Sequence, residues 1–277
     1  MTVINSNVSA LRASNASNSA QSALSIAMQR LSTGKRINSA KDDAAGLAIS
    51  ASMTSQVAGM NQGIRNANDG ISMAQTAEGA LDEVTNNLQR MRELQVQKTN
   101  GTYSPTDVAN IAAEQTALAT QITNVLTNTK FNGQPLFTGT AGTNGVVSIQ
   151  AGANTSDRIN MQLGGNLLTT SGVEGVLTGG ATPAVVATTL EAYDTAIANV
   201  VNRRSSLGAT QNQLQSAVNN LTSNATNLSD ARSRIEDTDY SSETTALAKA
   251  QILSQASTAM LSQANQSTQS VLKLLGQ

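Results

Sequence analysis

Apolar residues recur at alternating spacings of four and three over residues 53–91. Two polar residues, Glu78 and Thr85, interrupt the series. Its apolar members are Met53, Val57, Met60, Ile64, Ala67, Ile71, Ala74, Leu81, Leu88 and Met91. This spacing places one apolar stripe along a helix. The pattern predicts a helix from about residue 42 to 100, roughly 90 Å long at about 1.5 Å per residue.

A second series of the same kind covers residues 190–235. It is broken only by Arg204, Gln211 and Arg232. Its other members are Leu190, Tyr193, Ile197, Val200, Leu207, Leu214, Val218, Leu221, Ala225, Leu228 and Ile235. The series predicts another long helix. A compact globule of this chain length is only about 50 Å across, so helices this long predict an elongated bundle.

A shorter helix is predicted between them, beginning at Ser104. Ser104 is a favourable N-cap residue, Pro105 suits the first helical position, and Asp107 lies near the positive end of the helix dipole. The apolar face of this helix consists of Val108, Ile111, Leu118, Ile122 and Val125.

The helical pattern stops at the Gly- and Asn-rich stretch FNGQPLFTGTAGTNG. Two alternating runs follow, VVSIQ and RINMQL, separated by a Gly- and Asn-containing loop. They predict a small antiparallel β-hairpin. The next stretch, GGNLLTTSGVEGVLTGGATPAV, is typical of a surface connector.

Both ends of the chain are also predicted to be helical. The first forty residues carry an apolar stripe formed by Ile4, Val8, Leu11, Leu24, Met28 and Leu31. The last helix repeats Ala246, Ala250, Leu253, Ser257, Met260, Ala264, Ser267, Val271 and Leu274 at four-three spacing. We expect the two helices to pair. Their small seam residues predict weak order in the free chain and folding on assembly.

The predicted fold class is therefore mainly α. It is an elongated bundle of long helices with a small β-hairpin region, plus paired terminal helices forming a coiled-coil-like core. Only 2% of the 277 residues are aromatic, and the apolar residues are mainly Ala, Leu, Ile and Val. That composition suits thin seams between helices better than a thick interior.

Charge and composition narrow the classes of function. Seventeen basic residues against eighteen acidic ones give a net charge of -1, which predicts no attraction to nucleic acid or to an anionic membrane surface. The chain has no His and no Cys, so the commonest general base, the commonest metal ligand and all thiol chemistry are missing. We expect no catalytic residues, no metal and no cofactor. Avoidance of Cys suits a protein that works outside the cell, but it is also common by chance.

Some residues have a chemical and a structural interpretation. Asp42 and Asp43 resemble a carboxylate pair, but acidic residues that open a helix favour capping. Lys35 and Arg36 suggest a phosphate contact, but solvated or inter-subunit polar contact is the better interpretation. Met residues on a helix seam usually fill core space.

Neither a secretory signal nor a membrane span is predicted. The first thirty residues lack a basic segment followed by an unbroken apolar run. No run of about eighteen apolar residues occurs in the sequence. If the protein leaves the cell, another export route is needed.

Several segments at both ends resemble bacterial flagellin. They are INSNVSALRA, LSTGKRINSAKDDAAGLAIS, NQGIRNANDGISMAQTAEGALDEVTNNLQRMREL, TKFNGQPLF and the C-terminal stretch from SRIEDTDYSS to VLKLLGQ. The resemblance covers nearly the whole chain, in the order of the family. It implies a non-enzymatic subunit that polymerises into the flagellar filament used for swimming.

The resemblance also implies a division into domains. Residues 1–41 and 237–277 would form the inner filament core, and residues 42–236 a helical shell with a β-hairpin region at about 131–180. The middle is too short for the variable outer domains of larger relatives. Expected inner-core residues are Ile4, Val8, Leu11, Leu24, Leu31, Leu253, Met260, Val271, Leu272 and Leu275.

The segment LQRMRELQVQ is the most informative surface candidate. Its simplest interpretation is a plain helix with Leu88 and Met91 on the seam. The resemblance adds a contact between protofilaments and an epitope for Toll-like receptor 5. The residues assigned to this surface are Leu88, Gln89, Arg90, Glu93, Leu94 and Glu114. Gln95 departs from the small apolar residue usual in the family, which predicts weakened receptor binding.

Other implied partners are further copies of the chain, an export chaperone, the filament cap and the hook-associated junction proteins. The implied location is the extracellular filament, reached through the flagellar type III route without a cleaved signal peptide. Ser and Thr residues within 138–189 are candidates for glycosylation, with no position singled out. Two alternatives stay open: a hook-filament junction or adaptor protein, and an enzyme using Ser or Lys in an outer insert.

Overall fold

The computed structural model describes residues 6–168, 173, 176–177 and 189–275, with the side chains of residue 268 and residues 270–275 left out. The described chain contains two compact units. One combines Met1–Ser55 with Asn227–Gln277, and the other consists of Gln56–Thr226. We call them the terminal unit and the central unit. These bounds lie inside long helices, whereas the domain bounds expected from the sequence lie near helix ends.

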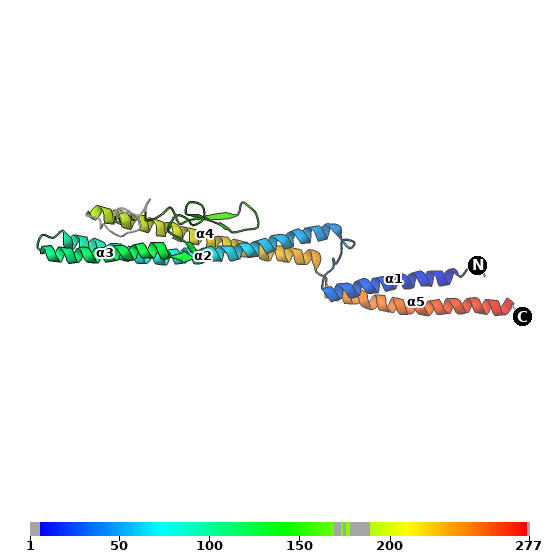
Figure 1. Cartoon of the computed structure of the whole chain (residues 1–277). Coiled ribbons are helices and arrows are strands. Elements are labelled where there is room, and N and C mark those ends of the chain that lie inside the picture. The colour runs from blue at the N-terminus through cyan, green and yellow to red at the C-terminus, as the bar shows by residue number, and fades with distance from the viewer. Residues whose placement is uncertain (1–5, 169–172, 174–175, 178–188, 276–277) are drawn as a thin grey trace. The chain divides into compact units, whose positions relative to one another are not determined.

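Five helices and two small hairpins make up the described elements. The helices are α1 (Val8–Thr33), α2 (Ala44–Lys98), α3 (Pro105–Asn128), α4 (Leu190–Glu236) and α5 (Tyr240–Leu275). The strands are β1 (Lys130–Phe131), β2 (Gln134–Pro135), β3 (Val146–Gln150) and β4 (Arg158–Gln162). Figure 1 shows α1 beside α5, and α2, α3 and α4 side by side. The mainly α fold class with paired terminal helices is confirmed.

Local sequence signals set the helix starts. The Ser104 side chain accepts a hydrogen bond from the Asp107 backbone N–H, and the Asp107 carboxylate accepts one from the Ser104 N–H, which forms a capping box before α3. Asp43 Oδ1 accepts a hydrogen bond from the Gly46 N–H at 2.8 Å, as expected for an N-cap of α2. Asp42 stabilises the turn before α2. Its Oδ2 accepts hydrogen bonds from the backbone N–H groups of Asn38 and Ser39.

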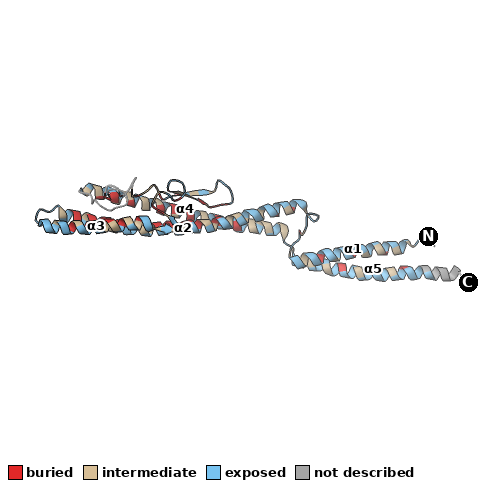
Figure 2. Cartoon of the chain, in the orientation of Figure 1, coloured by how far each residue is buried: buried red, intermediate tan, exposed pale blue. Residues whose placement is uncertain are grey.

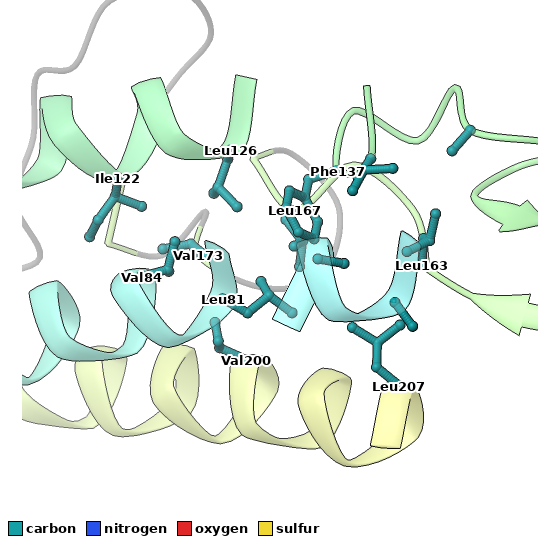
Figure 3. Packing of buried hydrophobic residues seen from close by; sticks show 14 of the residues in the cluster. Leu81, Val84, Ile122, Leu126, Phe137, Leu163, Leu167, Val173, Val200 and Leu207 are labelled. Carbon is teal, nitrogen blue, oxygen red and sulfur yellow. The ribbon is translucent and has the colours of Figure 1, made fainter. Parts of the chain in front are cut away.

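The hydrophobic core of the central unit lies between α2, α3 and α4. The stretch expected to be a surface connector contributes to it, because its apolar residues Leu167, Val173, Val176 and Leu177 are buried in the core. Figure 3 shows Leu81 and Val84 of α2 between Ile122 and Leu126 of α3 on one side and Val200 of α4 on the other. A helix that packs against two neighbours buries a wider face than one seam. Residues outside the predicted α2 series are therefore buried too, namely Met73, Ala77, Val84 and Leu94.

The β3–β4 hairpin follows the sequence prediction closely. The strands are antiparallel and pair Val146 with Gln162 and Gln150 with Arg158. Asn66 of α2 donates a hydrogen bond to the Gln150 carbonyl at 3.0 Å. The backbone can approach this closely because Gly63 lies beneath it: a Cβ at Gly63 would stand 2.8 Å from the Gly152 nitrogen.

Ion pairs also join α2 to α4. Arg92 Nε lies 2.6 Å from Asp194 Oδ1, and Arg204 Nη1 lies 2.9 Å from Asp82 Oδ1. The two pairs run in opposite directions along the two helices, so α2 and α4 are antiparallel. Hydrogen bonding to Asp194 raises the pKa of Arg92.

Candidate assembly surfaces

The terminal unit is built on the antiparallel pair α1 and α5. Asn7 Nδ2 donates a hydrogen bond to the Ala264 carbonyl at 3.0 Å, and Arg30 Nη1 lies 3.6 Å from Glu243 Oε2. The start of α1 therefore meets the later part of α5, and the end of α1 meets its beginning. The pairing predicted from the sequence is confirmed.

Small side chains form the seam between these two helices. The buried residues repeat every seven positions in each helix, as in an antiparallel coiled coil. They are Ala13, Ala20 and Ala27 of α1 and Ala250, Ser257 and Ala264 of α5. Small residues at the seam let two helices approach closely, and they leave little apolar area for the pair to bury by itself.

Large apolar residues of the same two helices lie on the outside. Leu11 is 62% exposed and Met260 is 63% exposed. The other exposed large apolar residues of the pair are Val8, Ile26, Met28, Tyr240, Ile252 and Leu253. Figure 2 shows the contrast, with α1 and α5 mostly exposed and the buried residues concentrated in the central unit. These side chains leave apolar surface on both helices that the described part of the chain does not cover.

A groove lies along the seam between α1 and α5. Its volume is about 540 Å³, and its lining includes the seam residues Ala13, Ser257 and Ala264 together with Arg12 and Met260. Most of its surface is apolar, which suits a side chain from another helix better than a polar ligand.

The expected inner-core residues fall into three groups in the structure. Val8, Leu11, Leu253 and Met260 are exposed. Leu24 and Leu31 are half-buried. Ile4 lies outside the described residues, and so do the side chains of Val271, Leu272 and Leu275.

The short segment between α1 and α2 is tied to the segment between α4 and α5. Gly34 closes α1 with a left-handed φ of 72° that favours glycine. Lys35 pairs with Glu236, and Arg36 Nη2 donates to the Ile235 carbonyl at 2.6 Å. Lys35 and Arg36 thus bind within the chain and are also exposed to solvent, as the sequence suggested.

The second candidate surface lies on α2 and α3. Arg90 Nη2 lies 2.9 Å from Glu114 Oε1, and Arg90 Nη1 lies 3.2 Å from Glu93 Oε2. The hydrogen bond to Glu114, followed by that to Glu93, raises the pKa of Arg90. Gln89, Arg90, Glu93 and Glu114 are exposed, so they can meet a partner.

Leu88 and Leu94 do not belong to this surface. Both side chains are buried in the central unit, where their neighbours are residues of the same chain. Gln95 is buried too, and its Oε1 accepts a hydrogen bond from Gln115 Nε2 at 3.2 Å. A partner that approaches this surface cannot contact the Gln95 side chain directly.

The described residues form neither a metal-binding cluster nor a membrane-spanning helix. No group of three or more His, Cys, Asp or Glu side chains is placed to hold a metal ion there. No helix in that part of the chain is long and apolar enough to cross a membrane.

Comparison with known proteins identifies the family. The bacterial flagellin N-terminal helical region matches residues 4–142, and the bacterial flagellin C-terminal helical region matches residues 190–275. A flagellin of Xenorhabdus nematophila is 45% identical over 99% of both chains, and one of Halalkalibacterium halodurans is 44% identical over 90% of both.

A solved structure described as a flagellar hook-associated protein from Vibrio parahaemolyticus shares the fold. Its TM-score is 0.58 at 17% identity, over 71% of this chain and 100% of that one. The match of both terminal regions and the full-length identity show that this chain belongs to the bacterial flagellin family.

Proposed function

We infer that this flagellin builds its filament by burying the outer face of α1 and α5 against further copies of the chain. Flagellins are structural subunits of the bacterial flagellar filament, an extracellular appendage, and they are not enzymes. One observation carries the assignment of the surface. The α1–α5 pair buries small residues such as Ala20 and Ala250 at its seam, whereas Leu11, Met28, Leu253 and Met260 are exposed. Burial of one Leu or Met side chain contributes about 1.5–3 kcal/mol, so the exposed residues provide a driving force for assembly.

The inner-core set proposed for this face is the one expected from the sequence. Leu24 and Leu31, which are half-buried in the single chain, would complete their burial against a neighbour. Ile4, Val271, Leu272 and Leu275 extend the same set toward both chain ends. We assign residues 1–41 and 237–277 to the inner core and residues 42–236 to the shell.

The proposed shell has no variable outer domain. The two matched flagellin regions leave only residues 143–189 between them, and part of this stretch forms β3 and β4. Ser and Thr residues of the 138–189 segment are the proposed glycosylation sites. An intact mass of native filament protein equal to the chain mass would exclude this modification.

A double substitution tests the assembly face. Leu11→Ser with Met260→Ser removes two exposed apolar side chains without changing the alanine seam. We expect the double variant to stay monomeric under conditions in which the wild-type chain forms sedimenting filaments. Val201→Ser is the control, because Val201 is an exposed apolar residue of α4 in the central unit. Normal filament growth from the double variant would contradict the proposal.

Further partners follow from membership in the family. We propose that the chain leaves the cell by the flagellar type III route without a cleaved signal peptide. The proposed partners on this route are the export chaperone, the filament cap and the hook-associated junction proteins. A role as a junction protein itself is the weaker alternative, because the hook-associated structure shares only the fold at 17% identity.

Recognition by Toll-like receptor 5 is proposed for the exposed α2–α3 surface. The proposed contact residues narrow to Gln89, Arg90, Glu93 and Glu114, since Leu88 and Leu94 are buried. The Arg90–Glu114 pair fixes the position of two of these side chains across α2 and α3. Receptor signalling by purified monomer, lost on Arg90→Ala and kept on Lys130→Ala, is the expected result.

A further inference from the structure

A second groove lies in the central unit, beside the turn that joins β1 to β2. Its volume is about 710 Å³, and its lining residues are Asp69, Met73, Phe131, Asn132 and Gln134. Polar and apolar atoms contribute equally to its surface. Asn132 has a φ of 49°, and this left-handed turn places Gln134 back beside Phe131.

The groove contains an exposed carboxylate without a partner. Among the described residues, none donates a hydrogen bond to Asp69 or forms an ion pair with it. Arg65 lies one helical turn earlier on α2, but its Nε donates to Gln62 Oε1 at 3.1 Å. The side-chain carboxylate of Asp69 is therefore available to a cation from outside the chain.

The rest of the lining suits the stem of a basic side chain. Met73 is buried and Phe131 is half-buried, so both present apolar surface at the base of the groove. The methylene groups of Lys or Arg pack well on such a surface while the charged head stays near water. An aromatic ring near the head adds a cation–π attraction, and the Asn132 and Gln134 amides offer acceptors.

Complementary cations are present in the same unit. Lys98 and Lys130 have no acidic partner within ion-pair distance among the described residues. Arg203 is excluded as a donor to a neighbour, because it is half-buried and its guanidinium packs against Gly164 of its own chain. In a polymer of one chain, both members of an intermolecular ion pair must be present on every copy and unpaired in the single chain.

We propose that the groove lined by Asp69, Phe131 and Gln134 binds a basic side chain of a second copy of this chain. This contact would join the central units of neighbouring subunits, in addition to the contact made by α1 and α5. The inference rests on the proposed assembly into a filament. It adds a polar contact that fixes the alignment of neighbours, which apolar packing alone defines poorly.

A pair of neutralising substitutions on α2 tests the proposal. Asp69→Asn removes the carboxylate from the groove, and Glu83→Gln removes an exposed carboxylate of the same helix outside it. We expect Asp69→Asn to raise the critical concentration for filament growth about three- to tenfold and to weaken its dependence on salt. Glu83→Gln should match the wild-type chain.

The outcomes separate this inference from the proposed function. Failure of the wild-type chain to polymerise would overturn the proposed function. Growth of Asp69→Asn at the wild-type critical concentration would overturn only the groove contact. A lower thermal midpoint of the Asp69→Asn monomer relative to Glu83→Gln would overturn it as well, because the carboxylate would then act within the chain.

Cross-linking identifies the occupant of the groove. The sequence has no Cys, so Asn68→Cys creates a single site for a benzophenone maleimide, at an exposed residue beside Asp69 that does not line the groove. Filaments are grown from a mixture of labelled chains and ¹⁵N-enriched chains, irradiated and digested. We expect cross-links to ¹⁵N peptides that contain Lys98 or Lys130. Cross-links found only within one chain, or to other segments of a neighbour, would overturn the proposal.

Discussion

Gln211 of α4 donates a hydrogen bond from Nε2 to Oε2 of Glu78 on α2 at 3.0 Å. Both residues interrupt the apolar series of their own helices, and the fold brings the two interruptions together. Polar residues at seam positions specify the register of paired helices, because a shifted register leaves each of them against apolar neighbours. The pair therefore selects one alignment of α2 against α4.

Replacing Gln211 by Leu should lower the stability of the central unit. Glu78 is half-buried and would lose its side-chain donor, at a cost of about 1 kcal/mol. Urea unfolding followed by circular dichroism measures the loss. Gln213→Leu is the control, since Gln213 is an exposed glutamine of the same helix. Equal midpoints for the two variants would show that the pair does not stabilise the fold.

Replacing each of two glycines of α2 by alanine should change the stability of the central unit in opposite directions. A Cβ at Gly63 would stand 2.8 Å from the Gly152 nitrogen, whereas nothing lies within 4 Å of a Cβ at Gly79. Gly63→Ala should therefore displace the β3–β4 loop and destabilise the unit. Gly79→Ala should stabilise it by about 0.5–1 kcal/mol through helix propensity. Thermal unfolding of both variants is the measurement, and the same sign of change in both would contradict the packing seen here.

The long helices and the β3–β4 hairpin could be predicted from the sequence because their periodicity is regular. The α1–α5 pairing could be predicted too, and the predicted series of the last helix contains its buried seam residues Ala250, Ser257 and Ala264. The same series contains Leu253 and Met260, which are exposed, and the predicted stripe of α1 missed the buried alanines of that helix. Hydrophobicity shows which residues avoid water and does not show whether the same chain or a neighbour covers them.

The residues of the second assembly surface, on α2 and α3, could be predicted only in part, because hydrophobicity does not show what covers a residue. Leu88 and Leu94 fit a helix that presents one face to a partner, but α2 packs against both α3 and α4 and buries them. The pairing of Arg90 with Glu114 depends on the position of α3 beside α2, which no local pattern contains. The groove at Asp69 requires the β1–β2 turn, whose strands are too short to show a period.

The capping box of α3 predicts that the stability of the folded state depends on pH. Hydrogen bonds from the Ser104 side chain and backbone hold the pKa of Asp107 below its ordinary value of 3.8. The folded state therefore binds this proton less readily than the unfolded state. The stabilisation is present above the ordinary pKa and is lost as the pH falls through the lowered one.

Asp107→Asn tests this dependence directly. The difference in urea midpoint between the wild-type chain and the variant should be constant from pH 7 to about pH 5 and should shrink below about pH 4. Glu83→Gln, at an exposed position of α2, serves as the control for a general effect of lost charge. A difference that grows toward low pH would contradict the assigned direction.

The alanine seam allows a direct test of how the terminal helices assemble. Ala20 is 5% exposed and lies in the seam, whereas Ala23 on the same helix is exposed. Leucine at residue 20 would force α1 and α5 apart, and overpacking of this kind costs about 1–3 kcal/mol. Leucine at residue 23 adds apolar area at an exposed position. Ala20→Leu should therefore raise the critical concentration for filament growth and lower the temperature at which filaments dissociate, while Ala23→Leu should leave α1 paired with α5.

Sedimentation of both variants over a range of concentrations and temperatures measures these effects. If Ala20→Leu filaments were as stable as wild-type filaments, the close approach of α1 and α5 would not be needed in the assembled state.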